Sequence, residues 1–261
     1  MAFEKKIHSG LNPRQIKILD YIQQQGFAAI DGLSEHFDVT PQTIRRDINQ
    51  LCERELLQRF HGGAGMPSSA ENIDYSTRQI HNRNEKKKIA ALVARFIPDH
   101  SSLFVNLGTT TEAVATALSR HRGLRVITNN LNVANTLSRA DESEVIIAGG
   151  VLRNRDNGIV GEATIDFVNQ FKVDFGVIGI SGIDQDGVLL DFDYREVRVA
   201  QAIIKNSRRV FLVADHSKFG RNAMVRLGHL RDVDAVFVDQ SPPQEVRQIL
   251  MEENVTLHIA E

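Results

Sequence analysis

The sequence has no tryptophan, a single cysteine and only six prolines. It also lacks any apolar run near the roughly 18 residues of a membrane span, and its first residues lack the apolar region of a signal peptide. One cysteine cannot form an intrachain disulfide and is typical of a reducing compartment. We therefore expect a cytoplasmic protein without membrane contact, in which Cys52 is a small core residue rather than a redox sensor.

An excess of charge of one sign is lacking as well. The 31 Lys and Arg residues are balanced by 33 Asp and Glu residues, which gives a formal net charge of −2. Hydrophobic residues make up 42% and charged residues 25% of the chain, values that are ordinary for a globular protein. A length of 261 residues leaves room for a small domain and a larger one.

Residues 40–51 have the pattern of a DNA-recognition helix. Thr40 is a good N-cap, and Pro41 stands at the first helical position, where its missing N–H costs nothing. One face has an apolar stripe, formed by Ile44, Ile48 and Leu51. The other face has side-chain types that bond to base edges, namely Gln42, Arg45, Arg46 and Asn49. An amphipathic surface helix with two solvated arginines is the alternative, which the flanking sequence must decide.

The flanking sequence predicts the rest of a helix-turn-helix. Upstream, residues 12–26 form a helix that starts at Asn-Pro and ends at Gln-Gly. A shorter helix follows, with Asp31 as its cap and with Leu33 and Phe37 four residues apart. Only residues 38–40 separate it from the recognition helix, the short connection that this motif requires.

Downstream, residues 56–61 alternate as a strand does and lead into Gly62-Gly63-Ala64. This pattern predicts a β-wing, with Arg59 and His61 directed at the DNA backbone. We therefore expect a winged helix-turn-helix in residues 1–66. Its expected DNA-binding residues are Thr40, Gln42, Thr43, Arg45, Arg46, Asn49, Arg59 and His61.

The charge of this module is unusual for DNA binding. Residues 1–66 have eight Lys or Arg and eight Asp or Glu, whereas DNA-binding domains are usually basic. A single module should therefore bind weakly. We expect a homo-oligomer that places several modules on repeated half-sites of operator DNA.

Beyond a polar linker at residues 67–80, residues 81–261 alternate strands and helices. The run Lys86-Lys87-Lys88 is interpreted as the solvated start of a helix. Strands are predicted at 103–107, 125–128, 145–148, 175–180, 210–214 and 235–238. Helices are predicted at 112–118, 163–170, 194–206 and 244–252. This order predicts an α/β domain on a largely parallel sheet.

Ligands of parallel sheets bind at the carboxyl ends of the strands, near helix N-termini. Four predicted strand ends have small, hydroxyl, amide or charged residues that suit a phosphorylated polyol or sugar. Glycine and free amides at a helix start bind phosphate, and a lysine adds a point charge. The candidate ligand residues are Gly108, Thr109, Thr110, Thr111, Thr128, Asn129, Asn130, Gly149, Gly150, Asp215 and Lys218.

Other motifs are excluded. Residues 184–187 resemble the start of a calcium loop, but the required later glycine and glutamate are absent, so we interpret them as a turn. Residues 215–217 are consecutive and cannot form a triad. The nine histidines lack metal-ligand spacing. We expect no metal and no cofactor.

The chain resembles the DeoR-type bacterial transcriptional regulators over nearly its whole length. The resemblance is carried by residues 40–47, 61–64, 108–110, 128–130, 149–150 and 215–219. A closer match, to the family members that control glycerol-3-phosphate utilisation, is carried by residues 129–137, 159–164 and 216–225. The family resemblance implies a sensor domain resembling ribose-5-phosphate isomerase, with the ligand bound where that enzyme binds its sugar phosphate. One departure is Asn106, where the family usually has aspartate.

The resemblance implies a repressor of glycerol and glycerol-3-phosphate utilisation genes that glycerol-3-phosphate releases from its operator. Another phosphorylated sugar as the ligand is one alternative. A second is a sugar-phosphate isomerase fused to a DNA-binding module, in which Glu196, Asp215 and Lys218 supply acid–base groups. We expect no enzyme, because a signal that is consumed is not stable.

Overall fold

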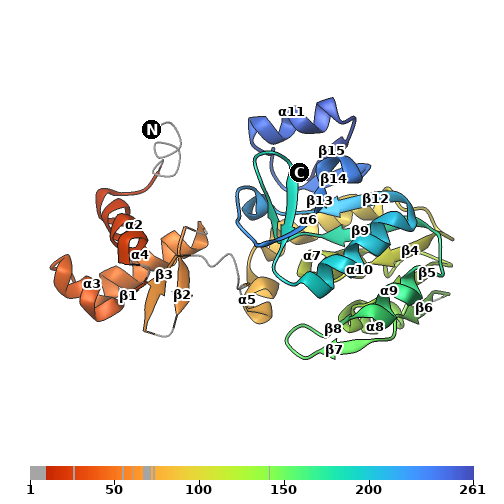
Figure 1. Ribbon diagram of the computed structural model, residues 1–261, viewed down its shortest axis with the longest axis horizontal. Helices are drawn as coiled ribbons and strands as arrows, with labels where there is room; N and C mark the ends of the chain where they lie inside the picture. Colours follow the sequence, from red (N-terminus) through yellow and green to blue (C-terminus); the bar gives the residue numbers. More distant parts are fainter. Residues whose placement is uncertain are drawn as a thin grey trace. The chain divides into compact units, whose positions relative to one another are not determined.

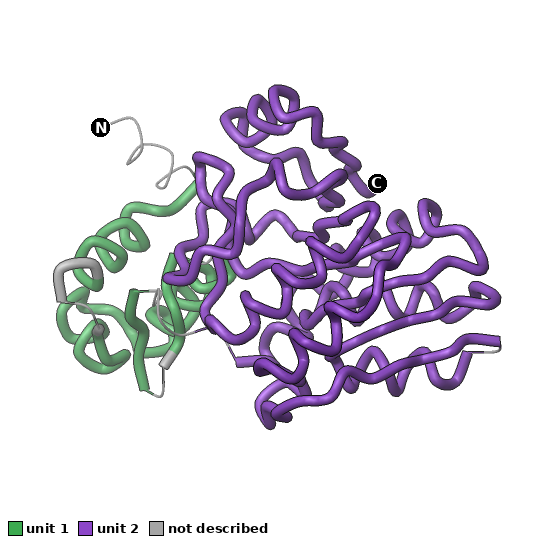
Figure 2. Tube along the Cα trace, turned by 45° about the vertical axis from the view of Figure 1, so that its right-hand side comes forward, with its two compact units in different colours: residues 1–68 green, residues 69–261 purple. Residues whose placement is uncertain are grey.

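The computed structural model describes residues 10–25, 27–54, 56–60, 62–66, 72, 74–140 and 142–261. The chain divides into two compact units, residues 1–68 and residues 69–261 (Figure 2). Within the described ranges, no helix combines the length and the apolar character that crossing a membrane requires.

The first unit contains the expected helix-turn-helix. Its helices are α2 (Pro13–Gln25), α3 (Ile30–His36) and α4 (Pro41–Glu53). The hydroxyl of Thr40 accepts a hydrogen bond from the Thr43 amide at 3.3 Å, as predicted for the N-cap of α4. One prediction is wrong: Asp31 is not a cap, because α3 already begins at Ile30. Asp31 lies in the first turn instead, where a carboxylate meets the positive end of the helix dipole.

A three-stranded antiparallel sheet completes this unit. Strands β1 (Phe27–Ala29), β2 (Gln58–Phe60) and β3 (Gly63–Gly65) pair in the order β1-β3-β2, and the hairpin of β2 and β3 is the predicted wing. The predicted apolar stripe of α4 is fully buried against α2 and α3. The unit is therefore a winged helix-turn-helix.

Cys52 contributes to the same core. Its side chain packs against the buried cluster of the first unit, and burial raises the pKa of its thiol to about 11. At neutral pH the thiol stays protonated, which makes it a poor nucleophile. The expected structural role of Cys52 fits this environment.

The second unit is built on a seven-stranded parallel sheet. In spatial order its strands are β15 (Thr256–Ile259), β14 (Ala235–Val238), β12 (Ser207–Val213), β9 (Val173–Gly179), β4 (Ser102–Val105), β5 (Arg125–Thr128) and β6 (Glu144–Ile147). All six predicted strands are present, and β15 is an additional one. Because every strand runs the same way, all carboxyl ends meet at one edge.

Helices cover both faces of this sheet (Figure 1). On one face lie α6 (Arg83–Ala94), α7 (Thr109–Leu118) and α8 (Leu131–Leu137). On the other lie α9 (Glu162–Val168), α10 (Tyr194–Lys205) and α11 (Gln244–Glu252). The strands alternate their apolar side chains between the two cores, so that Phe104 packs on one face while Leu103 and Val105 pack on the other. The result is the expected α/β architecture in three layers.

Shorter elements complete the second unit. They are α5 (Tyr75–Ile80), the hairpin β7 (Val151–Arg153) and β8 (Gly158–Val160), the antiparallel sheet β10 (Gly182–Ile183), β11 (Val188–Asp191) and β13 (Val225–His229), and the 3-10 helices η1 (His216–Lys218) and η2 (Leu230–Asp232). Residues 184–187 connect β10 to β11, so the predicted turn is confirmed.

A buried arginine joins the β7–β8 hairpin to α10. The Arg153 guanidinium donates to Asp156 at 2.6 and 2.8 Å, to Asp193 at 2.8 Å and to Glu196 at 2.7 Å, and its side chain is only 9% exposed. Burial opposes its charge, but Glu196 and Asp156 raise the pKa of Arg153 above its ordinary value. Charge therefore adds to the apolar packing of Ile159 and Val160 in β8, whereas Val151 and Leu152 of β7 are exposed.

Arg153→Met should reduce the free energy of unfolding by about 3–5 kcal/mol at pH 7, because three carboxylates lose their common partner. Arg125→Met is the matched control: Arg125 pairs with Glu144 at 3.2 Å, but both side chains are exposed, and such pairs contribute about 0–1 kcal/mol. Urea denaturation followed by circular dichroism measures both. Equal losses in the two variants would contradict the role given to Arg153.

Candidate DNA-binding surface and ligand site

The face of α4 that points away from the core has four exposed polar side chains. They are Gln42, Arg45, Arg46 and Asn49. Ile44 and Ile48 on the opposite face are fully buried, so the packing of the helix fixes which face meets solvent. The exposed types are those that can bond bidentately to guanine or adenine.

The wing contacts the same face. The exposed Arg59 of β2 donates a hydrogen bond to the Asn49 side chain of α4, which joins wing and recognition helix. At the start of α4 the hydroxyls of Thr40 and Thr43 lie 2.9 Å apart. His61 lies outside the described residues. The other seven expected DNA-binding residues thus belong to α4, its cap and the wing.

Sequence reasoning missed the polar contact that orients α4. Asp47 is buried at 3% exposure and accepts hydrogen bonds from Arg14 and Asn12, near the start of α2. Gln15 of α2 also donates to Gln50 of α4. These contacts join residues more than thirty positions apart in the sequence, so no local pattern predicts them.

At the carboxyl edge of the large sheet, a glycine loop connects β4 to α7. Gly108 has φ +139°, a conformation that favours glycine, and stands as the N-cap of α7. The Thr111 hydroxyl donates within this loop, with the carbonyls of Asn106 and Gly108 at 2.8 and 2.7 Å. Thr111 therefore shapes the loop, while the first amides of α7, at residues 109–111, lack partners within the helix by geometry. A helix start of this kind attracts anions.

The loop after β5 is also held by its own side chains. The Thr128 hydroxyl donates to the Val105 carbonyl at 2.7 Å and accepts from the Asn130 amide at 3.0 Å. Asn130 caps α8 with its side-chain oxygen and donates to Glu112 at 3.1 Å. Thr128 and Asn130 thus fix two strand ends relative to each other.

Three buried acceptor oxygens at this edge have no hydrogen-bond partner among the described residues. They are Asn106 Oδ1, Asn129 Oδ1 and Asp215 Oδ2, at the ends of β4, β5 and β12. Each residue is at most 2% exposed. A buried acceptor without a donor costs about 1–3 kcal/mol, so native proteins seldom retain several together. Hydroxyl groups of a ligand are donors that would satisfy them.

Asp215 is the charged member of this set. Its Oδ1 accepts from the side chain of Asn82 at 2.9 Å, and from the amide and hydroxyl of Ser217. Burial opposes ionisation, but Lys218, with Lys86 behind it, holds the pKa of Asp215 well below its usual range. The carboxylate is therefore ionised, and Lys218 lies half-buried beside it.

Lys86 corrects one interpretation of the sequence. Lys87 and Lys88 are exposed as expected, but Lys86 is only 4% exposed. Its ammonium group donates to the carbonyls of Arg78 and His81, and its charge acts on Asp215. All three lysines were predicted to be solvated, because the sequence does not show which of them faces the edge of the sheet.

The remaining sequence-predicted ligand residues follow β6. Gly150 has φ +150°, and a Cβ there would lie 2.2 Å from the Thr164 hydroxyl oxygen, whereas Gly149 faces open space. Thr164 in turn donates to the Gly149 carbonyl at 2.8 Å. This loop is thus shaped by glycine, as the sequence suggested.

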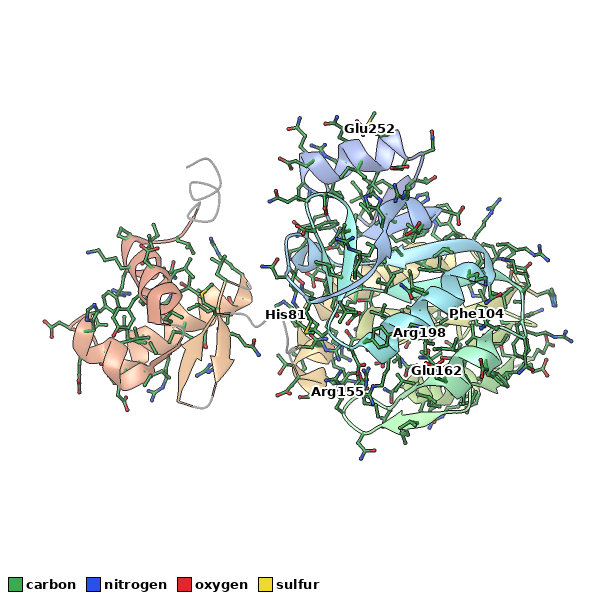
Figure 3. All side chains as sticks on the ribbon, in the orientation of Figure 1. His81, Phe104, Arg155, Glu162, Arg198 and Glu252 are labelled. Atoms are coloured by element: carbon green, nitrogen blue, oxygen red, sulfur yellow. The ribbon has the colours of Figure 1, made fainter. Side chains whose placement is uncertain are left out.

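A cavity of about 240 Å³ lies next to this edge. Its lining residues are Asn72, Asp74, Tyr75, Ser76, Arg78 and Arg155, of which Arg155 is labelled in Figure 3. Tyr75 also donates from its hydroxyl to Glu112 in the first turn of α7, at 2.7 Å. Neither Tyr75 nor Glu112 was predicted as a site residue, because their contact spans 37 positions of the sequence.

One of the acid–base candidates named from the sequence is already paired. Glu196, a conceivable acid–base group, is engaged at 2.7 Å by Arg153. Within the described ranges, His, Cys, Asp and Glu side chains form no group of three or more that could hold a metal ion. What remains is an anion-attracting helix start, a cationic side chain and unpaired acceptors.

Two family models match the chain. Residues 14–70 match the DeoR-like helix-turn-helix domain, and residues 81–240 match the DeoR C terminal sensor domain.

Three curated relatives span nearly the whole chain. A glycerol-3-phosphate regulon repressor of Escherichia coli (strain K12) is 54% identical over 242 residues, which are 93% of this chain and 96% of that protein. A protein of the same name from Haemophilus influenzae is 52% identical and covers 88% of this chain and 89% of its own. The HTH-type transcriptional repressor CsqR of Escherichia coli (strain K12) is 40% identical, covering 94% of each chain.

The solved structures that match about half of this chain include ribose-5-phosphate isomerases. The isomerase A of Neisseria gonorrhoeae is 14% identical, with a TM-score of 0.38 over 51% of this chain and 52% of that one. The isomerase of Methanocaldococcus jannaschii gives a TM-score of 0.39 at 12% identity, covering 53% and 55%. Likenesses of this size carry no argument about function.

The family models cover both units, and the relatives named above are repressors that match along almost their full length. The chain belongs to the DeoR family of helix-turn-helix transcriptional regulators.

Proposed function

We propose that this protein represses genes of glycerol and glycerol-3-phosphate utilisation, and that glycerol-3-phosphate releases it from its operator. The observation that carries the ligand half of the proposal is the group of three unpaired buried oxygens beside the start of α7 and Lys218. The names of the two most similar relatives described above support the choice of regulon.

The chemistry of the site supports a small phosphorylated polyol. The phosphate would lie at the α7 start, on the amides of residues 109–111, with Lys218 as its countercharge. The hydroxyls would donate to the unpaired oxygens, with Asn106 and Asn129 lying on adjacent strands, and the loops at Thr128, Asn130, Gly149 and Gly150 would enclose the ligand. Glycerol lacks the charge and should not bind measurably.

The number of unpaired acceptors at the edge favours testing a second candidate ligand. The edge has three unpaired acceptors, whereas glycerol-3-phosphate has two hydroxyl donors. A phosphorylated sugar with one more hydroxyl would satisfy all three. An isomerase is the less favoured alternative, since Glu196 is already bound to Arg153. Turnover assays on pentose and triose phosphates discriminate it.

For the DNA half, we propose that Gln42, Arg45 and Arg46 contact bases, with Thr40, Thr43, Asn49 and Arg59 around them and His61 in the wing. The neutral module argues for a homo-oligomer on repeated half-sites, held together through residues beyond Ile73. A coupling of about 1–3 kcal/mol per ligand is smaller than the roughly 5.5 kcal/mol that nearly complete release needs. Several coupled subunits would supply the difference.

Arg45→Ala or Arg46→Ala should weaken binding to operator DNA selected from a random pool by about 1–3 kcal/mol, because each removes a bidentate base contact. Arg59→Ala should instead weaken binding to all sequences and flatten the salt dependence. Fluorescence anisotropy measures these affinities. Arg247→Ala, on the exposed face of α11, is the control. An unchanged operator affinity in the folded Arg45, Arg46 double variant would rule out the assignment.

Lys218→Ala should bind the operator normally but no longer respond to glycerol-3-phosphate, since the phosphate loses its countercharge. A thermal-shift titration with glycerol-3-phosphate, glycerol and a panel of phosphorylated sugars is the measurement, followed by anisotropy on operator DNA. Release at the wild-type ligand concentration would remove Lys218 from the site.

Asn106→Leu should have opposite effects on stability and binding. Without ligand, the melting temperature should rise, because an unpaired buried acceptor that costs about 1–3 kcal/mol is replaced by an apolar group of similar shape. The ligand-induced shift should fall or vanish. Calorimetry with and without glycerol-3-phosphate checks both. A variant that is less stable but keeps the full shift would show that the Asn106 oxygen does not face the ligand.

A further inference from the structure

The part of the second unit that follows the domain boundary is held almost entirely by polar contacts. We call Asn72 together with residues 74–86 the tether segment. Its helix α5 has no buried residue, and Ile80 is 77% exposed. Five of the six residues that line the 240 Å³ cavity belong to this segment. An element with little apolar packing beside a cavity opens at low cost in free energy.

The first contact of the tether segment goes to the start of α7. The Tyr75 hydroxyl donates to Glu112 at 2.7 Å and accepts from the Asn132 side chain at 2.8 Å. Asn132 also donates to Glu112, at 3.0 Å. Burial and the neighbouring Glu112 raise the pKa of Tyr75 above its usual value, so the phenol keeps the proton that it donates. Glu112 directly follows the residues proposed to hold the phosphate.

The second contact goes to Asp215. Asn82, the N-cap of α6, donates to Asp215 Oδ1 at 2.9 Å, while Oδ2 of the same carboxylate is unpaired. Asn82 has φ +51°, a left-handed conformation that few non-glycine residues adopt. Lys86, the last residue of the segment, donates to the carbonyls of Arg78 and His81 within the same segment.

The third contact is made by Asn72. Its side chain accepts from Arg221 at 3.0 Å and lies 3.4 Å from the Ser181 hydroxyl, to which it donates. Ser181 follows β9, and Arg221 follows the loop that holds Lys218. All three contacts therefore end on helix starts or loops at the carboxyl edge, on or next to residues of the proposed ligand site.

We propose that the tether segment transmits ligand occupancy to the DNA-binding unit, with Tyr75 as the positioning residue that links it to the first turn of α7. The inference rests on the proposed function. A ligand acts on DNA binding only through a difference in affinity between two states. Here the tether segment is held by residues of the proposed ligand site or by their direct neighbours. Along the chain, the segment follows the DNA-binding unit.

The test is Tyr75→Phe, which removes the hydroxyl that joins Glu112 and Asn132 and that also accepts from Gln79 within α5. Tyr194→Phe is the matched control, because Tyr194 is a 60% exposed tyrosine on α10 that bonds only to Arg198 in the structure as described. The full-length proteins are compared by operator affinity with and without saturating glycerol-3-phosphate. Ligand affinity without DNA is measured by calorimetry, and melting temperatures check folding.

In the wild type and in Tyr194→Phe, the ligand should lower operator affinity by at least the about 5- to 150-fold typical of one coupled site. In Tyr75→Phe this ratio should fall towards one, while the ligand still binds. By linkage, operator DNA should also cease to weaken ligand binding in that variant. A purely structural tyrosine would lower the melting temperature without changing the ratio.

Two results would overturn the proposal: a wild-type ratio in Tyr75→Phe, or a variant that no longer binds ligand, which would put Tyr75 in the site itself. The experiment also distinguishes failure of the tether proposal from an error in the proposed ligand. If another phosphorylated sugar releases the wild type, glycerol-3-phosphate is the wrong ligand, and loss of the response to that sugar in Tyr75→Phe still supports the tether segment.

Discussion

The buried carboxylate of Asp215 determines how the carboxyl edge of the sheet is built. A charge with no solvent contact needs cationic neighbours and donors, and it obtains them from two directions. Lys218 and Ser217 come from its own loop, and Asn82 and Lys86 come from the start of α6. One oxygen satisfies the fold, and the other is left unpaired. If the proposed ligand binds here, structure and recognition share a single side chain.

Much of the fold follows from local patterns. The cap at Thr40, the apolar stripe of α4 and the alternation of strands and helices depend on neighbours within about one turn or one strand, and the structure agrees at these places. The β5 and β14 strands and α11 have the predicted bounds. Asp31 and Lys86 were misinterpreted because each choice depends on tertiary context: where the helix begins, and which lysine of a run faces the sheet.

The sequence predicted where the candidate site lies, but not the role of each side chain in it. Parallel topology indicated which loops would meet, whereas only the structure separates the side chains that build the loops from those left unpaired. The hydroxyls of Thr111 and Thr128 are used within the protein, while Asn129 and Asp215 each retain an unpaired oxygen. Tyr75 and Glu112 lie 37 positions apart, and contacts at that separation leave no periodic signal.

The topology of the large sheet has a consequence for synthesis on the ribosome. Its central strand β9 pairs with β4, made earlier, and with β12, made later, so the sensor cannot close until most of the chain has emerged. The first unit ends at residue 68, and residues 69–261 take roughly 10–40 s more at 5–20 residues per second. During that interval the nascent DNA-binding unit can fold without a sensor to control it. Because its charge is neutral, we expect a single copy to bind DNA weakly before the sensor is complete.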